Sequence, residues 1–157
     1  MSDRTSADGG GTVEILSFRL DGQEYGLDIM QVREIRGWSR ATPLPHAPSY
    51  VRGVINLRGA VLPVIDLAER LGLEPPAAGD RAVIIVVQDG GRVTGLLVEA
   101  VSDILVVRAD DLQAPPDLPA QTGATEGCIA ALTVLNDRML RVLNIRAVLP
   151  LPEQDAA

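Results

Sequence analysis

The sequence is poor in the residues on which most catalytic and metal chemistry depends. Its 157 residues include one Cys, one His and four aromatic side chains, and all 14 basic residues are Arg. Cys128 cannot form an internal disulfide, and with His46 as the only other soft ligand a zinc site is not expected. Without Lys there is no Gly-x4-Gly-Lys phosphate loop, and one His offers no convincing Ser-His-Asp set. We therefore expect no catalytic site, no metal and no cofactor.

Positive charge and long apolar runs are also scarce. The formal net charge is −7, which disfavours binding to a phosphate backbone or to an anionic membrane surface. The longest apolar run, Ala82 to Val87, is far shorter than a membrane span. The N-terminus is polar and Gly-rich and has no apolar signal-peptide core. We expect a cytoplasmic protein with no nucleic-acid partner and no direct membrane insertion.

The few remaining candidates for chemistry have simpler interpretations. Asp110 and Asp111 are adjacent acids on a polar turn, a pattern typical of a solvated face. His46 lies among prolines and is interpreted as a packing or hydrogen-bonding residue. Cys128 begins an apolar run and is interpreted as a buried, inert thiol.

The segment Tyr50 to Leu67, YVRGVINLRGAVLPVIDL, predicts a β-hairpin. Two apolar arms rich in β-branched residues flank a turn in which Gly59 can supply a positive φ and Asn56 suits a strand end. Arg58 lies on this turn, where folding does not require a charge. An Arg at a turn tip can clamp a partner's carboxylate or carbonyl, or it can bond within the chain across two barrels.

The end of this hairpin predicts a strand followed by a short helix. Pro63 lacks a backbone N–H, so the second arm is expected at a sheet edge or a bulge. Asp66 is predicted to cap a helix over Leu67 to Leu71 that ends at Gly72.

Other stretches predict further short strands. The alternation of apolar and polar residues over Glu14 to Leu20 predicts a half-buried strand, and Glu24 to Ile29 a returning one. Met30 to Ile35 is predicted as a helical turn, because Val32 and Ile35 are three residues apart. Later strands are expected at Ile35–Trp38, Arg81–Gln88, Arg92–Val98, Val101–Val107, Cys128–Leu135 and Met139–Ile145.

The sequence contains an internal repeat. At an offset of 69 residues Gly26 matches Gly95, and further on Val64 matches Val142 at an offset of 78. Each copy holds about five short strands, a spacing that suggests two related small β-barrels packed together, with short helices, in an all-β fold. The two predicted barrel subdomains, intertwined or packed together, correspond to approximate halves 14–75 and 80–150, between disordered tails at 1–13 and 151–157. The groove between the barrels is a natural place for a partner to bind.

Four sequence runs carry a resemblance to a known family. EYGLDIMQVREIRG, YVRGVINLRGAVLPVIDL, RVTGLLVEAVSDIL and NDRMLRVLNI resemble CheW, the chemotaxis coupling proteins, in order from about residue 14 to 148. The resemblance implies two SH3-like five-stranded barrels and a non-enzymatic adaptor. Its implied partners are the cytoplasmic tip of methyl-accepting chemotaxis receptors and the regulatory domain of the histidine kinase CheA, in arrays at the membrane. A CheW-like scaffold of a parallel chemosensory pathway with another output is the alternative.

The resemblance also implies site residues. Two glycines, Gly53 and Gly59, match family glycines that allow turns. Contacts with the kinase are expected at exposed barrel ends and are not assigned to residues. The receptor-facing set, on an apolar surface with a charged rim, would be Val32, Glu34, Ile35, Arg58, Val101 and Ile104.

Two functions of other classes remain as alternatives. A small-barrel nucleic-acid binder would need a basic groove with stacking aromatics, against which the charge and the four aromatics argue. A small enzyme would need at least two groove carboxylates with shifted pKa values. Glu34 and Asp103 are equivalent in the repeat and could lie near each other, but no partner base is evident.

Overall fold

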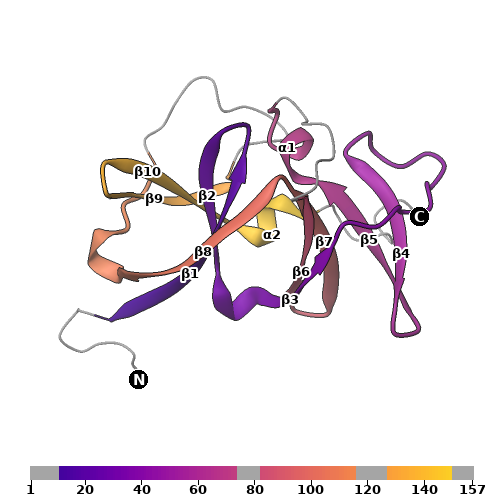
Figure 1. The fold of residues 1–157 in the computed structure, drawn as a ribbon, viewed down its shortest axis with the longest axis horizontal. Coiled ribbons are helices and arrows are strands. Elements are labelled where there is room, and N and C mark those ends of the chain that lie inside the picture. The colour runs from indigo at the N-terminus through magenta and orange to yellow at the C-terminus, as the bar shows by residue number, and fades with distance from the viewer. Residues whose placement is uncertain (1–10, 74–81, 116–126, 150–157) are drawn as a thin grey trace.

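The computed structural model describes residues 11–73, 82–115 and 127–149. Its strands form two five-stranded sheets that lie side by side along the longest axis, with the short helices α1 and α2 between them (Figure 1). The chain is therefore an all-β protein with a few short helices, as the sequence predicts, and the two sheets are consistent with paired SH3-like barrels.

The first sheet has the strand order β8-β1-β2-β10-β9. All its neighbouring pairs are antiparallel except β2 and β10, which run parallel. Its strands are β1 (Thr12–Leu20), β2 (Gln23–Asp28), β8 (Ala100–Arg108), β9 (Ile129–Leu135) and β10 (Arg138–Leu143).

The second sheet has the order β3-β6-β7-β5-β4, with β5 and β7 parallel. Its strands are β3 (Val32–Gly37), β4 (Val51–Leu57), β5 (Ala60–Asp66), β6 (Val83–Asp89) and β7 (Arg92–Val98). The helical segments are η1 (Ile29–Gln31), α1 (Leu67–Arg70), η2 (Ala109–Asp111) and α2 (Ile145–Val148).

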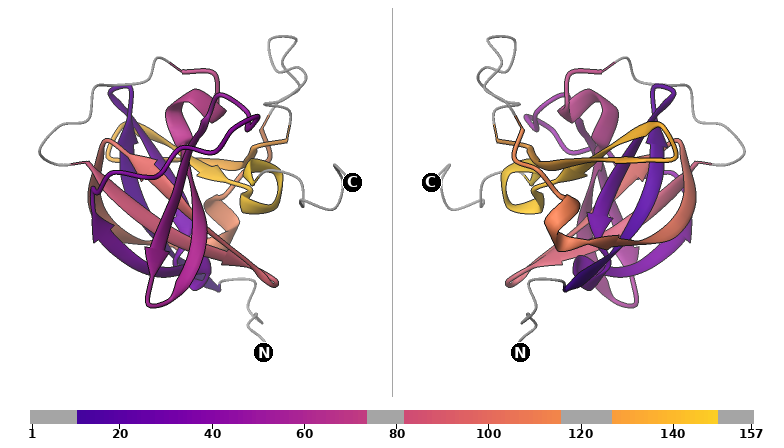
Figure 2. Two further views of the ribbon diagram at one scale, coloured as in Figure 1. Left: turned by 90° about the vertical axis from the view of Figure 1, so that its right-hand side faces the viewer. Right: turned by 90° about the vertical axis from the view of Figure 1, so that its left-hand side faces the viewer.

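The two sheets exchange strands between the repeat copies. When β1 to β5 are replaced by β6 to β10 and the reverse, the order of the first sheet becomes the order of the second. Each copy gives its first two strands to one sheet and its last three to the other, an interlocking that is visible from both ends of the molecule (Figure 2). The sequence halves 14–75 and 80–150 therefore do not each build a sheet of their own.

Two glycines show how closely the copies correspond. A Cβ on Gly26 would lie 2.5 Å from the Ile15 side chain, and a Cβ on Gly95 would lie 2.8 Å from Ile84. Ile15 and Ile84 are themselves 69 residues apart. Both glycines stand on the strand that pairs in parallel with the other copy, where packing leaves no room for a side chain. The repeat is thus a repeat of packing as well as of sequence.

The main core lies between the two sheets. Buried side chains from both sheets and both α-helices form one cluster, including Phe18, Leu27, Ile65, Ile85 and Ile145. A smaller cluster fills each sheet's own barrel. Since burial of apolar surface is the main stabilising term, the two sheets are joined by the largest part of the core.

The segment after β2 differs from the prediction. The helical turn covers only Ile29–Gln31, where the Asp28 carboxylate accepts from the Met30 N–H at 2.9 Å. Val32 to Gly37 is a strand, so the helical turn predicted over Met30 to Ile35 is wrong there. The spacing of three residues between Val32 and Ile35 fits a helix face, but in a strand it places them on opposite faces.

The hairpin forms as predicted, with a two-residue turn at Arg58 and Gly59. Both residues have positive φ, 53° and 85°, as in a type I′ turn. The Asn56 side chain accepts from the Gly59 N–H at 3.0 Å, which explains its position at the strand end. Gly53 is not at a turn: it lies inside β4 beside a register shift, with φ 140°.

Pro63 stands in an internal strand rather than at an edge, since β5 lies between β7 and β4. The parallel ladder with β7 covers only Val64 to Asp66, so the missing N–H of Pro63 lies just before it. The Asp66 side chain caps α1 by accepting from the Glu69 N–H at 3.2 Å, and Gly72 has a positive φ after the helix, as predicted.

β1 begins at Thr12, two residues before the predicted strand start. The predicted tail at 151–157 and most of the predicted N-terminal tail lie outside the described residues.

Candidate functional surface

The receptor-facing candidates come mainly from two equivalent strands. β3 carries Val32, Glu34 and Ile35, and β8 carries Val101 and Ile104. Each strand is the outermost strand at one side of its sheet. The candidate set is therefore a repeated element that occurs once on each sheet.

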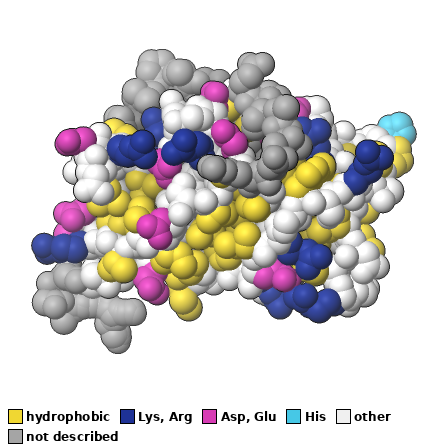
Figure 3. Space-filling model, viewed as in Figure 1, with side chains coloured by type: hydrophobic (Ala, Val, Ile, Leu, Met, Phe, Trp, Pro, Cys, Tyr) yellow, Lys and Arg dark blue, Asp and Glu magenta, His cyan; other side chains and the backbone are white. Residues whose placement is uncertain are grey.

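The four apolar candidates divide into two kinds. Val32 and Val101 are half-buried and pack against the core cluster between the sheets. Ile35 and Ile104 are exposed, with 44% and 53% of their surface accessible. Apolar side chains gather over the middle of the face shown in Figure 3, where the two sheets meet. An apolar surface supported from below by the core is suited to binding another protein.

Glu34 and Arg58 form an ion pair. An Arg58 Nη donates to the Glu34 carboxylate at 2.5 Å, and Arg36 approaches the same carboxylate at 3.9 Å. The Arg58 side chain is 70% exposed. The bond joins β3 to the β4–β5 turn within one sheet, so it does not cross the two barrels. Arg58 therefore has an intramolecular partner and still presents free N–H donors to solvent.

Asp103 does not share the arrangement of its repeat equivalent Glu34. Its carboxylate accepts from the Ile104 N–H at 2.8 Å. Its backbone N–H and C=O both bond to the Ser17 hydroxyl at 3.1 Å. Glu34 instead bonds to Arg58, so the two acids have separate partners.

A hollow lies between β3 and the β4–β5 hairpin. Its volume is about 450 Å³, and both Glu34 and Arg58 line it together with Leu57, Val61 and Val93. The other candidates do not line this hollow. That Arg58, Val101 and Ile104 line one groove stays a prediction.

The repeat places a second hollow at the equivalent position of the other sheet. It has a volume of about 380 Å³ and is lined by Asp103, Leu135 and Met139, which match Glu34, Leu57 and Val61. Val61 and Met139 are both exposed. Neither residue is among the candidates predicted from the sequence, although the offset of 78 residues that relates the two hairpins identifies them as a pair.

The other sequence candidates lie apart from this surface. Cys128 is buried, and burial raises the pKa of its thiol despite the nearby Arg70, as expected for an inert thiol. His46 is exposed in the β3–β4 connection with a positive φ. Within residues 11–73, 82–115 and 127–149, no three His, Cys, Asp or Glu side chains are grouped as metal ligands. No helix in the same ranges is long and apolar enough to cross a membrane.

Comparison with known proteins extends over nearly the whole chain. The CheW-like domain family matches residues 14–153. The chain belongs to this family. It is 48% identical over 146 residues to the chemotaxis protein CheW of Rhizobium meliloti (strain 1021), covering 92% of each chain.

More distant relatives are also CheW proteins. The chain is 38% identical over 136 residues to the chemotaxis protein CheW of Klebsiella aerogenes, covering 87% of this chain and 81% of that one. The crystal structure of the scaffolding protein TtCheW from Thermoanaerobacter tengcongensis superimposes with a TM-score of 0.79 at 29% identity, over 85% of this chain and 90% of that chain. The sequence-based family assignment is confirmed, and the family is one of chemotaxis scaffold or adaptor proteins.

Proposed function

We propose that this chain is a non-enzymatic adaptor that couples methyl-accepting chemotaxis receptors to the histidine kinase CheA. The observation that carries the proposal is the match to CheW proteins over almost the full length, at up to 48% identity. The exposed apolar residues on β3 and β8 and the exposed Arg58 supply a surface of the kind that such coupling requires. The adaptor works in the cytoplasm and joins the receptor array at the membrane through its partners.

The proposed receptor contact uses Val32, Glu34, Ile35, Arg58, Val101 and Ile104. A receptor helical hairpin lies with its apolar side against Ile35 and Ile104, and the charged rim sets its register. The ion pair with Glu34 fixes the Arg58 side chain before binding, which lowers the entropy lost when Arg58 donates to a receptor carboxylate or carbonyl.

A charge swap separates a direct contact from a purely structural role of the ion pair. Arg58→Glu places two carboxylates together and should weaken co-sedimentation with a receptor signalling fragment. The double variant Glu34→Arg/Arg58→Glu restores an ion pair at the same place with the charges exchanged. If Arg58 contacts the receptor, the double variant still binds weakly. Recovery of full binding would show that only the pair, and not the position of its positive charge, is needed.

A binding assay with the purified chain tests whether its partners are CheA and a chemotaxis receptor. CheA regulatory domain and receptor fragment are each offered to the chain at equal concentration, with Arg108→Glu as the control variant at an exposed Arg outside the proposed receptor-facing set. The proposal expects binding to both partners. Binding to neither contradicts it, whereas binding to the kinase and receptor of a second chemosensory system alone would place the chain in that parallel pathway.

A further inference from the structure

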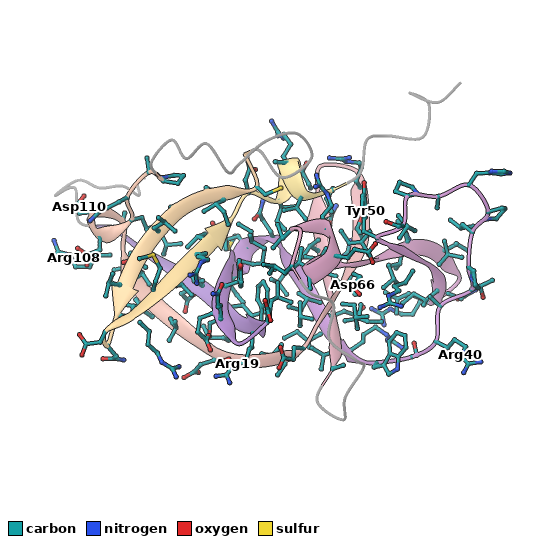
Figure 4. All side chains as sticks on the ribbon, turned by 90° about the horizontal axis from the view of Figure 1, so that it is seen from above. Arg19, Arg40, Tyr50, Asp66, Arg108 and Asp110 are labelled. Carbon is teal, nitrogen blue, oxygen red and sulfur yellow. The ribbon has the colours of Figure 1, made fainter. Side chains whose placement is uncertain are left out.

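The connection between β3 and β4, residues 38–50, projects from the end of the molecule beyond the second sheet (Figures 1 and 4). It carries Trp38 and Leu44 with 40% and 45% of their surface exposed. Exposed Trp and Leu side chains on one connection are available to contact a partner, and connections this long are often functional.

The middle of this connection is fixed to β4. Thr42 and Val54 exchange both backbone hydrogen bonds, at 2.8 and 2.9 Å. Beneath Thr42 lies Gly53, whose missing side chain lets the Thr42 carbonyl approach the strand. Ala41 is buried against the core of the second sheet. The connection is therefore anchored to the sheet at Ala41 and Thr42.

Its far end is fixed as well. The Val51 N–H donates to the Pro48 carbonyl at 2.9 Å. Between prolines 45 and 48, His46 has φ 64°, a conformation that costs free energy in a non-glycine residue. A loop that keeps a strained residue and an exposed Trp in a fixed shape has already lost the conformational entropy that binding would otherwise remove.

The charge of this region is opposite to that of the whole chain. Residues 35–65 contain four Arg and no Asp or Glu, although the chain's net charge is −7. Three of these Arg side chains pair with Glu34 or Asp66. Arg40 makes no hydrogen bond or ion pair within the described part of the chain, and Figure 4 shows it pointing away from the molecule at the outer end. The exposed apolar side chains thus share the connection with an unpaired cation.

We propose that residues 38–48 form a preorganised docking loop for an acidic segment of a protein partner, with an apolar side chain of that segment packing on Trp38 and Leu44. The loop lies outside the receptor-facing set, and the inference does not depend on receptor or kinase coupling. A peptide is favoured over an anionic membrane because Arg40 is the only unpaired cation among residues 35–65, all of which the structure describes. The chain as a whole is acidic, so a negatively charged bilayer would repel it.

Trp38 is the only Trp of the chain, so its fluorescence reports directly on this loop. The probe is a Trp-free helical peptide of Glu and Leu, compared with the same peptide carrying Lys in place of Glu. We expect the acidic peptide to shift the Trp38 emission to the blue and to protect it from acrylamide, and the basic peptide to do neither. The effect should weaken at high salt, because exposed charges are screened.

Two charge variants of the full chain decide whether the response is local. Arg40→Glu should weaken the acidic peptide's binding about tenfold, the change expected for loss of one charge-assisted contact. Arg108→Glu removes another exposed Arg at the opposite end of the molecule and should bind as the unaltered chain does (Figure 4).

Three results would overturn the inference. These are no change in Trp38 emission with the acidic peptide, an equal loss of binding in both variants, or a response to phosphatidylglycerol vesicles and not to the peptide. Circular dichroism of each variant confirms that the fold is kept, and Leu44→Ser provides a second variant that should also weaken binding without altering charge.

Discussion

At Gly53 the backbone leaves no space for a side chain. Its φ is 140°, and a Cβ there would collide with the carbonyl oxygen of Thr42, which is held in place by accepting from the Val54 N–H. Gly59 also has a positive φ, but its Cβ would meet no atom within 4 Å. Both glycines were predicted to allow turns. In the structure Gly53 is required by close packing against Thr42, and Gly59 is required by the backbone conformation of the turn.

Substitution of the two glycines should therefore have unequal effects. We expect Gly53→Ala to lower the free energy of unfolding by about 3 kcal/mol. The strain of a positive φ in alanine adds to the collision of its Cβ with the Thr42 carbonyl. Gly59→Ala should cost about 1 kcal/mol, from the backbone conformation alone. Urea unfolding of the two variants measures both values. Equal losses would contradict the close approach of Thr42 to β4.

The buried Cys128 predicts a decline in stability at alkaline pH. Burial raises the pKa of its thiol, and burial likewise raises the pKa of Tyr25 against the opposing effect of Arg141. As the pH rises beyond roughly 8.5, the usual pKa of a thiol, the unfolded chain loses this proton before the folded chain does. The contribution of the protonated Cys128 thiol to stability is therefore complete below that pH, and it is lost as the pH rises through the thiol's pKa in the folded state.

This decline can be assigned to the thiol by comparison with Cys128→Ala. The variant keeps Tyr25 but has no thiol, so its urea midpoint should fall less steeply between about pH 8 and 10. The comparison uses only the slope of the urea midpoint against pH. The substitution also leaves a small cavity, whose destabilising effect does not depend on pH. Parallel slopes would show that Cys128 does not titrate differently in the two states.

Among the elements, α1 and α2 are joined by one buried side chain. Arg70 at the end of α1 donates from Nε to the Val148 carbonyl at 2.8 Å and from Nη2 to the Ala147 carbonyl at 2.7 Å. Its guanidinium also lies 5.3 Å from the centre of the Tyr50 ring. These bonds satisfy carbonyls at the end of a four-residue helix that has no side-chain cap at its start.

Removal of this guanidinium should destabilise the fold strongly. Arg70→Leu leaves buried carbonyls without donors, and we expect a loss of about 2–4 kcal/mol in the free energy of unfolding. Arg70→Lys should recover only part of it, because an ammonium cannot reproduce the two-pronged geometry. The control is Arg146→Leu at an 82% exposed side chain, expected to change stability by less than about 0.5 kcal/mol. Similar losses at both positions would contradict the capping role.

The elements themselves were largely predictable where local chemistry decides them. The turn chemistry at Arg58 and Gly59 and the cap at Asp66 act over a few residues, and both are found as predicted. The segment from Val32 to Ile35 was not predictable from spacing, because its strand conformation depends on pairing with β6, more than forty residues away. Arg58 was recognised as a candidate, but its partner Glu34 could be found only when the folded sheet brought them together.

The whole molecule decides a point that the repeat left open, namely whether the two barrels are intertwined or only packed together. The repeat fixes the order of strands within each copy but does not say which copy supplies a strand's neighbour. Here β2 pairs with β10 and β5 with β7, so each sheet draws on both copies. The exchange of strands between the two copies lets the apolar faces of both sheets share one core. Two separate barrels would each have a smaller core.

Strand exchange predicts that neither half of the chain folds alone. A chain opened between Pro76 and Ala77 gives fragments that hold two strands of one sheet and three of the other. Each fragment by itself should lack β-sheet signal by circular dichroism, and an equimolar mixture should regain it. Independent folding of either fragment would contradict the observed topology.

The central claim is that the chain couples receptor to kinase, and the autophosphorylation rate of CheA tests it most directly. The rate is measured with receptor signalling fragment in the presence and absence of the chain, and with Ile35→Ser/Ile104→Ser, which changes two exposed side chains and should leave folding intact. The account predicts that the chain raises the rate and that the double variant does not. An unchanged rate with the unaltered chain, while it binds both partners, would contradict coupling.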